Sequence, residues 1–497
     1  MDPRNQMLTE SVRQKWDAIV NHEALPEIKD SYRKTVTTIL LENQENALLT
    51  ENGVLGTSLG NVGGGSGSTT GIDAFDPILI SLVRRSMPNL MAYDIAGVQP
   101  MNGPTGLIFA MKTKYGGADA STGSRGNSEA LFNEADSGYS GKNTITKNTN
   151  QTGANNQAAG SNSYHAGNMG DMFAGDVGGG SDGSFEAGTG MPTTTAETLG
   201  STGNAFNQMS FTIEKTSVTA RSRALKAEYT TELAQDLKAV HGLDAETELA
   251  NILSTEIMFE INRELVRTIY QIARLGCQQA DLNGKQAGKG LNGNAGGGVY
   301  DLELDSDGRW SAEKFRGLTF QLEREANVIG AETRRGKANF AIVSPDVGAA
   351  LSMSGLLDFS PAFSGGINTD VNGNSFAGTL HQGRIKVYID PYSMPTQYAN
   401  FTPVNYVCVG YKGTSPYDAG VFYCPYVPLQ MVRAVDTSTF QPKIGFKTRY
   451  GMVSNPFVTT SVGGYTPDGE QLTPRVNQYY RIFRVDNLHG NDASYGG

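Results

Sequence analysis

The pattern of apolar and polar positions predicts a helical segment at the start of the chain. Apolar residues recur at helical spacing over residues 6–50, in two runs that separate near Leu25 and Pro26 because proline cannot continue a helix. The runs contain Val12, Trp16, Ile19 and Val20, then Ile28, Tyr32, Val36, Ile39 and Leu40. Both stripes are narrow, so we expect a separate helical module without a stable core of its own. Such a module would need a binding partner to hold it in place.

Polar and glycine-rich positions mark the end of this segment. The second helix is expected to end at Asn43-Gln44-Glu45-Asn46, and residues 53–71 are rich in Gly, Ser and Thr, a composition typical of a flexible linker. Asp76 and Pro77 then supply the N-cap and first-turn proline of a short helix that stops at Pro88.

Strict alternation of side chains predicts two strands on either side of a long insert. Residues 107–115 alternate, and Met209, Phe211 and Ile213 alternate again, so we expect them to form one long two-stranded ribbon. The insert at 116–205 contains 19 glycines in 90 residues and few core-forming side chains. It is either a surface loop without a stable fold or a small glycine-rich lobe whose order depends on neighbouring subunits.

The most regular apolar stripe predicts a long helix over residues 244–275, with Asp244 as its N-cap. At about 1.5 Å per residue such a helix is nearly 50 Å long and can serve as the spine of a domain. Helices and strands then alternate downstream: a helix from Ser311, a strand at 340–343, a helix opened by Ser344-Pro345-Asp346, and strands at 385–389, 406–410 and 421–427. This order indicates an α+β fold.

Composition favours a protein that buries its surface against neighbours. Only 18% of the 497 residues are charged, the net charge is −10, and no block of like charges occurs, which argues against a dedicated nucleic-acid-binding protein. No apolar stretch approaches the roughly 18 residues of a membrane span, so we expect a soluble protein made in the cytoplasm. Cys277, Cys408 and Cys424 are widely spaced and are expected to be reduced, buried thiols.

Motifs for catalysis, metal binding and cofactor binding are missing from the sequence. The five histidines are isolated, the glycine runs do not form a phosphate-binding loop, and no G-x-S-x-G sequence occurs. We therefore predict no enzyme activity and no cofactor.

Several blocks, in order along the chain, resemble the major capsid proteins of T-even-like contractile-tailed bacteriophages (myoviruses). They include GVQPMNGPTG at 97–106, ELAQDLKAVHG at 232–242 and GFKTRYG at 445–451. Further matches lie at 88–90, 225–229, 256–258, 260–264, 410–413, 418–420, 425–427 and 455–457. The similarity covers the helical N-terminus and most of 76–457, and its length and order make it specific.

The resemblance implies the tailed-phage capsid fold, with an N-terminal arm, an extended loop carrying an inserted lobe, a peripheral domain with a long spine helix, and an axial domain. The expected divisions are a helical propeptide at 1–51, a flexible linker at 52–75, an arm with a docking helix at 76–104, an extended loop at 105–222 with its insertion lobe at 116–205, a peripheral domain at 223–300, an axial domain at 301–440 and a return to the peripheral domain at 441–497. The implied function is self-assembly, through hexameric capsomers, into an icosahedral shell around the phage genome.

The resemblance also implies that the chain is made as a precursor and trimmed after a glutamate in a Leu/Ile-x-Glu context during head maturation. Leu49-Thr50-Glu51 fits this pattern, with Asn52 as the new first residue; Leu8-Thr9-Glu10 also fits but lies near the start, so we favour Glu51. The implied partners are an internal scaffold, a prohead protease, vertex and portal proteins, possible outer decoration proteins, and packaged double-stranded DNA bound without sequence specificity. The implied location is the virion capsid, after assembly in the host cytoplasm.

Two aromatic residues of the predicted ribbon are the best candidates for an assembly interface. If the ribbon lies across a neighbouring subunit, Phe109 and Phe211 should be exposed in the monomer and buried in the shell. Two other functions stay open from sequence: a vertex subunit of the same fold that forms pentamers, and a glycine-rich, carbohydrate-binding surface protein that uses the insert.

Overall fold

The structure is a computed structural model, and it divides into two compact units, Met1–Leu107 with Thr216–Gly497, and Ile108–Lys215. The residues that it describes are 12–17, 19–21, 28, 30–59, 90–116, 131, 140, 190–201, 206–277, 298–303, 305–306, 310–358, 375–380, 383–393, 405–436, 441–455 and 475–488. The predicted docking helix, the linker beyond residue 59 and most of the insert therefore lie outside the described residues.

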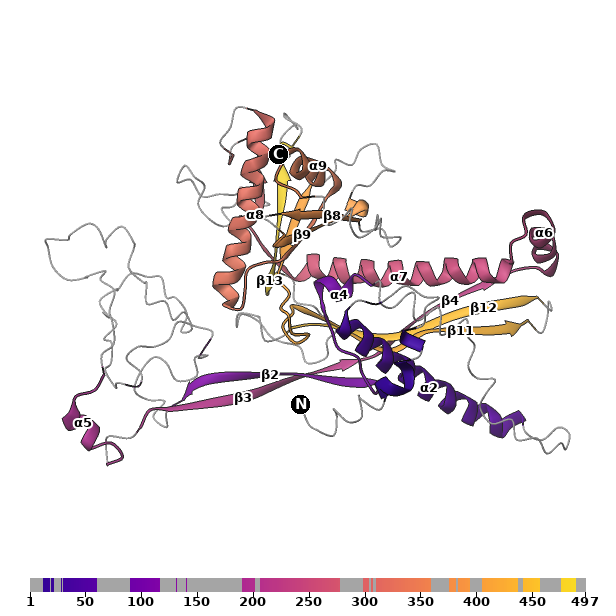
Figure 1. Cartoon of the computed structure of the whole chain (residues 1–497), viewed down its shortest axis with the longest axis horizontal. Coiled ribbons are helices and arrows are strands. Elements are labelled where there is room, and N and C mark those ends of the chain that lie inside the picture. The colour runs from indigo at the N-terminus through magenta and orange to yellow at the C-terminus, as the bar shows by residue number, and fades with distance from the viewer. Residues whose placement is uncertain are drawn as a thin grey trace. The chain divides into compact units, whose positions relative to one another are not determined.

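The described residues form both helices and strands, as expected for the predicted α+β fold (Figure 1). The helices are α2 (Ser31–Leu59), α4 (Ala92–Ile95), α5 (Thr193–Glu197), α6 (Thr231–His241), α7 (Ala245–Ile272), α8 (Ser311–Thr333), α9 (Pro345–Met353) and the 3-10 turn η2 (Pro391–Ser393). The strands are β1 (Gly97–Val98), β2 (Thr105–Gly116), β3 (Gln208–Thr219), β4 (Arg221–Glu228), β5 (Ala273–Leu275), β6 (Val299–Asp301), β7 (Phe340–Val343), β8 (Ser375–Leu380), β9 (Ile385–Ile389), β10 (Tyr406–Gly410), β11 (Val421–Val435), β12 (Pro442–Ser454) and β13 (Asn477–Asp486).

The long helix α7 confirms the predicted spine. Its N-cap is Asp244, whose carboxylate accepts a hydrogen bond from the Glu246 amide at 3.3 Å. Residues spaced three or four apart on one side are buried, namely Ile257, Ile261, Leu265, Ile269 and Ile272. The helix ends three residues before the predicted end, because Ala273–Leu275 leave the helix to form strand β5, which pairs with β13.

The first sheet has four strands in the order β1-β11-β12-β4, and both α2 and α7 lie against it (Figure 1). Strands β11 and β12 form a long antiparallel pair from Val421 opposite Ser454 to Val435 opposite Pro442. Ile444, Phe446, Thr448 and Tyr450 alternate as the buried side of β12. One face of this sheet therefore contributes to an apolar core that also includes α7 and the N-terminal segment.

The second sheet has seven strands, and both of its faces are buried. Side chains of β7 alternate between two cores: Phe340 and Ile342 join the core around α7, whereas Ala341 and Val343 join a second core with α8 and α9. This double burial explains the uninterrupted apolar run at 340–343, which does not alternate in sequence. The predicted helices at Ser311 and Pro345 are confirmed as α8 and α9.

The N-terminal segment differs from the sequence prediction in two respects. Helix α2 continues through Asn43–Asn46 to Leu59, so its predicted end was wrong, and residues 52–59 of the expected linker are helical. The N-terminal segment is also not a separate module, because Trp16, which precedes α2, and Val36 and Leu40 of α2 belong to the same core as α7. The polar run did not stop the helix because Asn43 is buried and hydrogen-bonded to other parts of the chain.

Candidate assembly sites

Strands β2 and β3 pair in a two-stranded sheet, which confirms the predicted ribbon. Phe109 is 58% exposed and Phe211 is 62% exposed, and Met209 and Ile213 on the same side of β3 are exposed as well. Alternate residues of a strand point to the same face, so Met209, Phe211 and Ile213 form one apolar row. This exposed row makes the ribbon a candidate interaction surface.

A second exposed apolar surface, not predicted from sequence, lies where α6 meets α7. Helix α6 is well capped: the Thr230 hydroxyl accepts from the Leu233 amide at 3.3 Å, and Gly242 takes the left-handed conformation (φ 68°) that suits a glycine after a helix. None of its residues is buried. Figure 1 shows α6 at the end of α7, where β4 and β11 end and β12 begins.

The exposed apolar residues at this end, which we call the α6 surface, are Leu233, Val240, Leu243, Ile252, Val432 and Val435. Leu233, Leu237 and Val240 are spaced by four and three positions, the spacing of one helix face. That spacing is the sequence signal that could have identified the surface. Since α6 has no buried side of its own, the α6 surface is a second candidate interaction surface.

Polar contacts fasten the N-terminal segment to the rest of the chain. The Asn43 side-chain amide donates to the Met101 carbonyl at 2.7 Å and to the Tyr426 carbonyl at 3.0 Å. The Tyr32 hydroxyl donates to the Val98 carbonyl, and Arg33 Nη2 lies 2.8 Å from Asp94 Oδ1. These bonds join α2 to the segment 90–101 and to β11.

Lys412 lies beside this contact. Its ammonium donates to the Tyr93 carbonyl, and burial lowers the pKa of Lys412 to about 8, although the Asp94 carboxylate opposes the shift.

The predicted cleavage residues Leu49, Thr50, Glu51 and Asn52 all lie inside helix α2. Their backbone is helical, and their side chains lie outside the described part of the chain.

Ion pairs fix the spine helix to both sheets. Arg223 of β4 reaches Glu260 at 2.9 Å and Glu264 at 2.5 Å on α7. Arg263 of α7 lies 2.7 Å from the fully buried Asp390, whose Oδ2 also accepts from the hydroxyls of Tyr270 at 3.0 Å and Tyr406 at 2.9 Å. Burial raises the pKa of both tyrosines, so they remain protonated donors to that carboxylate.

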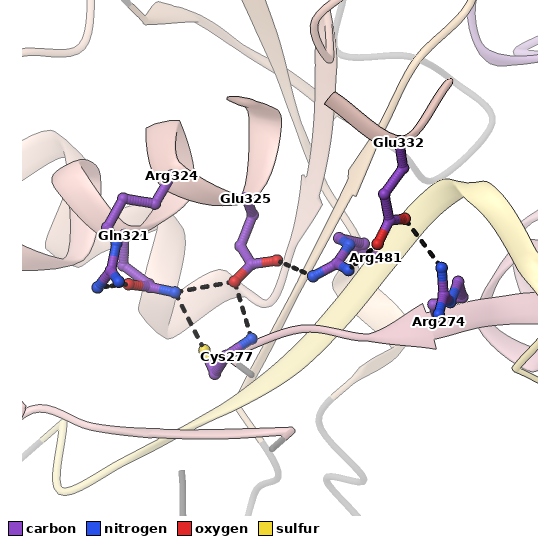
Figure 2. Close-up of polar contacts among 7 residues, drawn as sticks. All are labelled: Arg274, Cys277, Gln321, Arg324, Glu325, Glu332 and Arg481. Carbon is purple, nitrogen blue, oxygen red and sulfur yellow. Dashed lines mark hydrogen bonds and ion pairs between the residues drawn. The ribbon is translucent and has the colours of Figure 1, made fainter. Parts of the chain in front are cut away.

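A buried ion network joins α8, β5 and β13 (Figure 2). Glu325 accepts from the Cys277 backbone amide at 2.8 Å, from Gln321 Nε2 at 2.9 Å and from Arg481 Nη1 at 3.1 Å. Arg481 Nη2 also reaches Glu332 Oε1 at 2.7 Å, and Arg274 binds the other oxygen of Glu332 at 3.0 Å. Carboxylates and guanidinium groups alternate, so each buried charge has an opposite neighbour.

Cys277, Cys408 and Cys424 are free and buried, and burial raises the pKa of each thiol, to about 12 for Cys424, so all three stay protonated near neutral pH. Among the residues that the structure describes, no group of three His, Cys, Asp or Glu side chains could hold a metal ion. The described helices include none long and apolar enough to cross a membrane.

Comparison with known proteins decides between the possible classes. The family described as "Major capsid protein Gp23" matches residues 72–485. The chain belongs to the Gp23 major capsid protein family. It is 37% identical to the major capsid protein of Salmonella phage ViI, over 97% of this chain and 99% of that protein. It is 38% identical to the major capsid protein of Vibrio phage KVP40, over 96% of this chain and all of that protein.

Membership of the Gp23 family makes this chain a capsid protein with an α+β fold. A weaker similarity extends to the capsid vertex protein of Enterobacteria phage T4, which is 28% identical over 50% of this chain and 53% of that protein. The similarity to major capsid proteins is thus both higher and nearly twice as extensive.

Proposed function

We propose that this chain is the major subunit of an icosahedral phage head and that it assembles through hexameric capsomers into a shell around double-stranded DNA. The observation that carries the proposal is the end-to-end similarity to major capsid proteins of myoviruses. The exposed apolar ribbon and the α6 surface support it, because a shell subunit must bury such areas against its neighbours.

Electron microscopy of the purified protein, alone and from phage particles, tests this proposal. Closed shells or hexagonal sheets are the expected products, and a stable monomer at every concentration would refute shell formation. Occupancy in the particle separates the major subunit from the vertex subunit, since only the major subunit occurs in hexamers. Vertex-only occupancy would overturn the assignment in spite of the sequence similarity.

The second part of the proposal is that the precursor is trimmed after Glu51. The Leu49-Thr50-Glu51 sequence fits the cleavage pattern implied by the family, and it lies downstream of the docking contacts made by Tyr32, Arg33 and Asn43. Proteases bind extended substrates, so the end of α2 would have to unwind before cleavage. An internal scaffold, a prohead protease, a portal and outer decoration proteins are the remaining partners of this proposed assembly pathway.

Mass spectrometry of the capsid protein in mature particles identifies the first residue. We expect Asn52. A chain that starts at Met1 or Asp2 would exclude trimming, and one that starts at Ser11 would assign the cut to Leu8-Thr9-Glu10 instead.

A further inference from the structure

The contacts described between the N-terminal segment and the body of the chain come from residues well before Glu51. Asn43 bonds to two backbone carbonyls. Tyr32 and Arg33 make further polar contacts, at the opposite end of the docked part of α2. A cut after Glu51 would therefore leave these contacts intact.

Apolar packing reinforces the polar contacts. Trp16, Val20, Ile28, Val36, Leu40 and Leu41 are all buried, each with at most 6% of its surface exposed. They belong to one core with residues that include Leu90, Ile95 and Tyr423. Burial of large apolar side chains stabilises a complex, because it removes apolar surface from water. The docked surface therefore has the character of a stable interface and not of a loose contact.

The segment is also held together by bonds of its own. The Trp16 indole donates to Glu42 Oε2 at 2.9 Å, Lys15 pairs with the same carboxylate at 3.2 Å, and Lys34 donates to the Asn21 side chain at 3.1 Å. These bonds tie the first helical stretch to α2. The first helical stretch and α2 can therefore stay associated with each other without the covalent connection at Glu51.

We propose that cleavage and release of the N-terminal peptide are separate steps, and that the surface formed by residues 90–101 and β11 is a binding site that retains peptide 1–51 after the cut. The inference rests on the proposed trimming. Cleavage removes only the tether, which raises the effective concentration of the peptide at the site but contributes none of the contacts. Release then requires the site itself to open, so a shell can be fully cut while its subunits still carry the peptide.

One buried side chain weakens this binding site. Gln44 is only 3% exposed, and neither its amide nitrogen nor its amide oxygen has a hydrogen-bond partner within the described part of the chain. A buried amide without partners opposes docking because it loses its bonds to water and gains none. Asn43 therefore strengthens the binding of the peptide to its site, whereas Gln44 weakens it. Substitution of Asn43 should lower the affinity for the peptide, and substitution of Gln44 should raise it.

The test uses the full-length chain with a recognition sequence for a site-specific protease inserted directly after Glu51. The intact chain is folded first and then cut, and the peptide that stays with the body is followed over time by gel filtration and mass spectrometry. Asn43→Ala should release the peptide about tenfold faster or more, since two buried carbonyls lose their donor. Gln44→Leu should slow release by about fivefold or more.

Asn251→Ala is the matched control, because Asn251 is an exposed residue of α7 outside the binding site. Its release rate should equal that of the unmodified sequence. Immediate loss of the peptide from the unmodified chain, or equal rates for Gln44→Leu and Asn251→Ala, would overturn the inference even if Asn43→Ala failed to fold. Mature particles in which residues 1–51 are still covalently joined to the capsid protein would instead refute the trimming, so the two failures are distinguishable.

Discussion

Replacement of Arg481 tests whether the buried ion network stabilises the second sheet against α8. Arg481→Met removes the guanidinium group that lies 3.1 Å from Glu325 and 2.7 Å from Glu332. Glu325 is fully buried, so its carboxylate would keep only two neutral donors, the Cys277 amide and the Gln321 side chain. Removing one partner of a buried ion pair costs about 3–5 kcal/mol, because the other charge stays buried without compensation.

Two further variants separate charge compensation from simple loss of contact. Arg274 pairs with the same Glu332 at 3.0 Å, but its side chain is 28% exposed, so Arg274→Met should cost only about 0–1 kcal/mol. The double variant Glu325→Gln with Arg481→Met removes both buried charges, while the amide oxygen introduced at position 325 can still accept from the Cys277 amide. It should therefore regain most of the stability that Arg481→Met alone loses.

Thermal unfolding of the unassembled chain, followed by circular dichroism, measures these differences. For a lobe of roughly 150–250 residues, a loss of about 3–5 kcal/mol lowers the midpoint by roughly 6–20 °C. Arg274→Met should lower it by roughly 4 °C at most. Equal midpoints for Arg481→Met and Arg274→Met would show that the loss of Arg481 does not leave a destabilising buried charge on Glu325. A double variant less stable than Arg481→Met would show that Glu325 stabilises the lobe through bonds other than that pair.

Three other outcomes are expected. Phe211→Asp should abolish particle formation while the monomer folds normally. The control variant Ser210→Asp, on the other face of β3, should still assemble. Equal particle yields for the two variants by electron microscopy would contradict this. Val240→Asp should reduce assembly without lowering the midpoint of thermal unfolding, and a destabilised monomer would show that α6 packs on its own chain. The pKa of Lys412 is about 8 in the folded chain and 10.5 ordinarily, so between these pH values the unfolded chain holds this proton and the folded chain does not. The free energy of unfolding of the unmodified chain, relative to that of Lys412→Met, should therefore rise from pH 8 to pH 10.5. A pH-independent difference between the two in urea unfolding would refute this.

The elements with one clear period were predictable from sequence. The stripe of α7 and the alternation in β2 and β3 each match a single geometry, and the structure confirms them. Strand β11 extends eight residues beyond its predicted end at Val427, since its register with β12 shifts between Pro425 and Gln430 and breaks the alternation in sequence.

The candidate sites were only partly predictable, because burial depends on partners far away in the chain. The sequence around Asn43 predicts the end of a helix, whereas in the structure Asn43 lies within α2 and donates to the carbonyls of Met101 and Tyr426. The ion network was hidden for the same reason, since Glu325 and Arg481 lie 156 positions apart and resemble solvated charges in sequence. The exposure of Phe109 and Phe211 agrees with the proposed interface.

The separation of Ile108–Lys215 from the rest of the chain has a consequence for how these proteins diversify. The unit is one continuous stretch of the chain, so its covalent connections to the remainder lie at its two ends, and the register of β4 with β12 is fixed by residues outside it. Sequence can therefore be added or removed at the glycine-rich segment without shifting any strand of the first sheet. A phage lineage could exchange that segment under selection from its surroundings while its shell lattice stays constant, and a foreign peptide could be carried there at one copy per subunit.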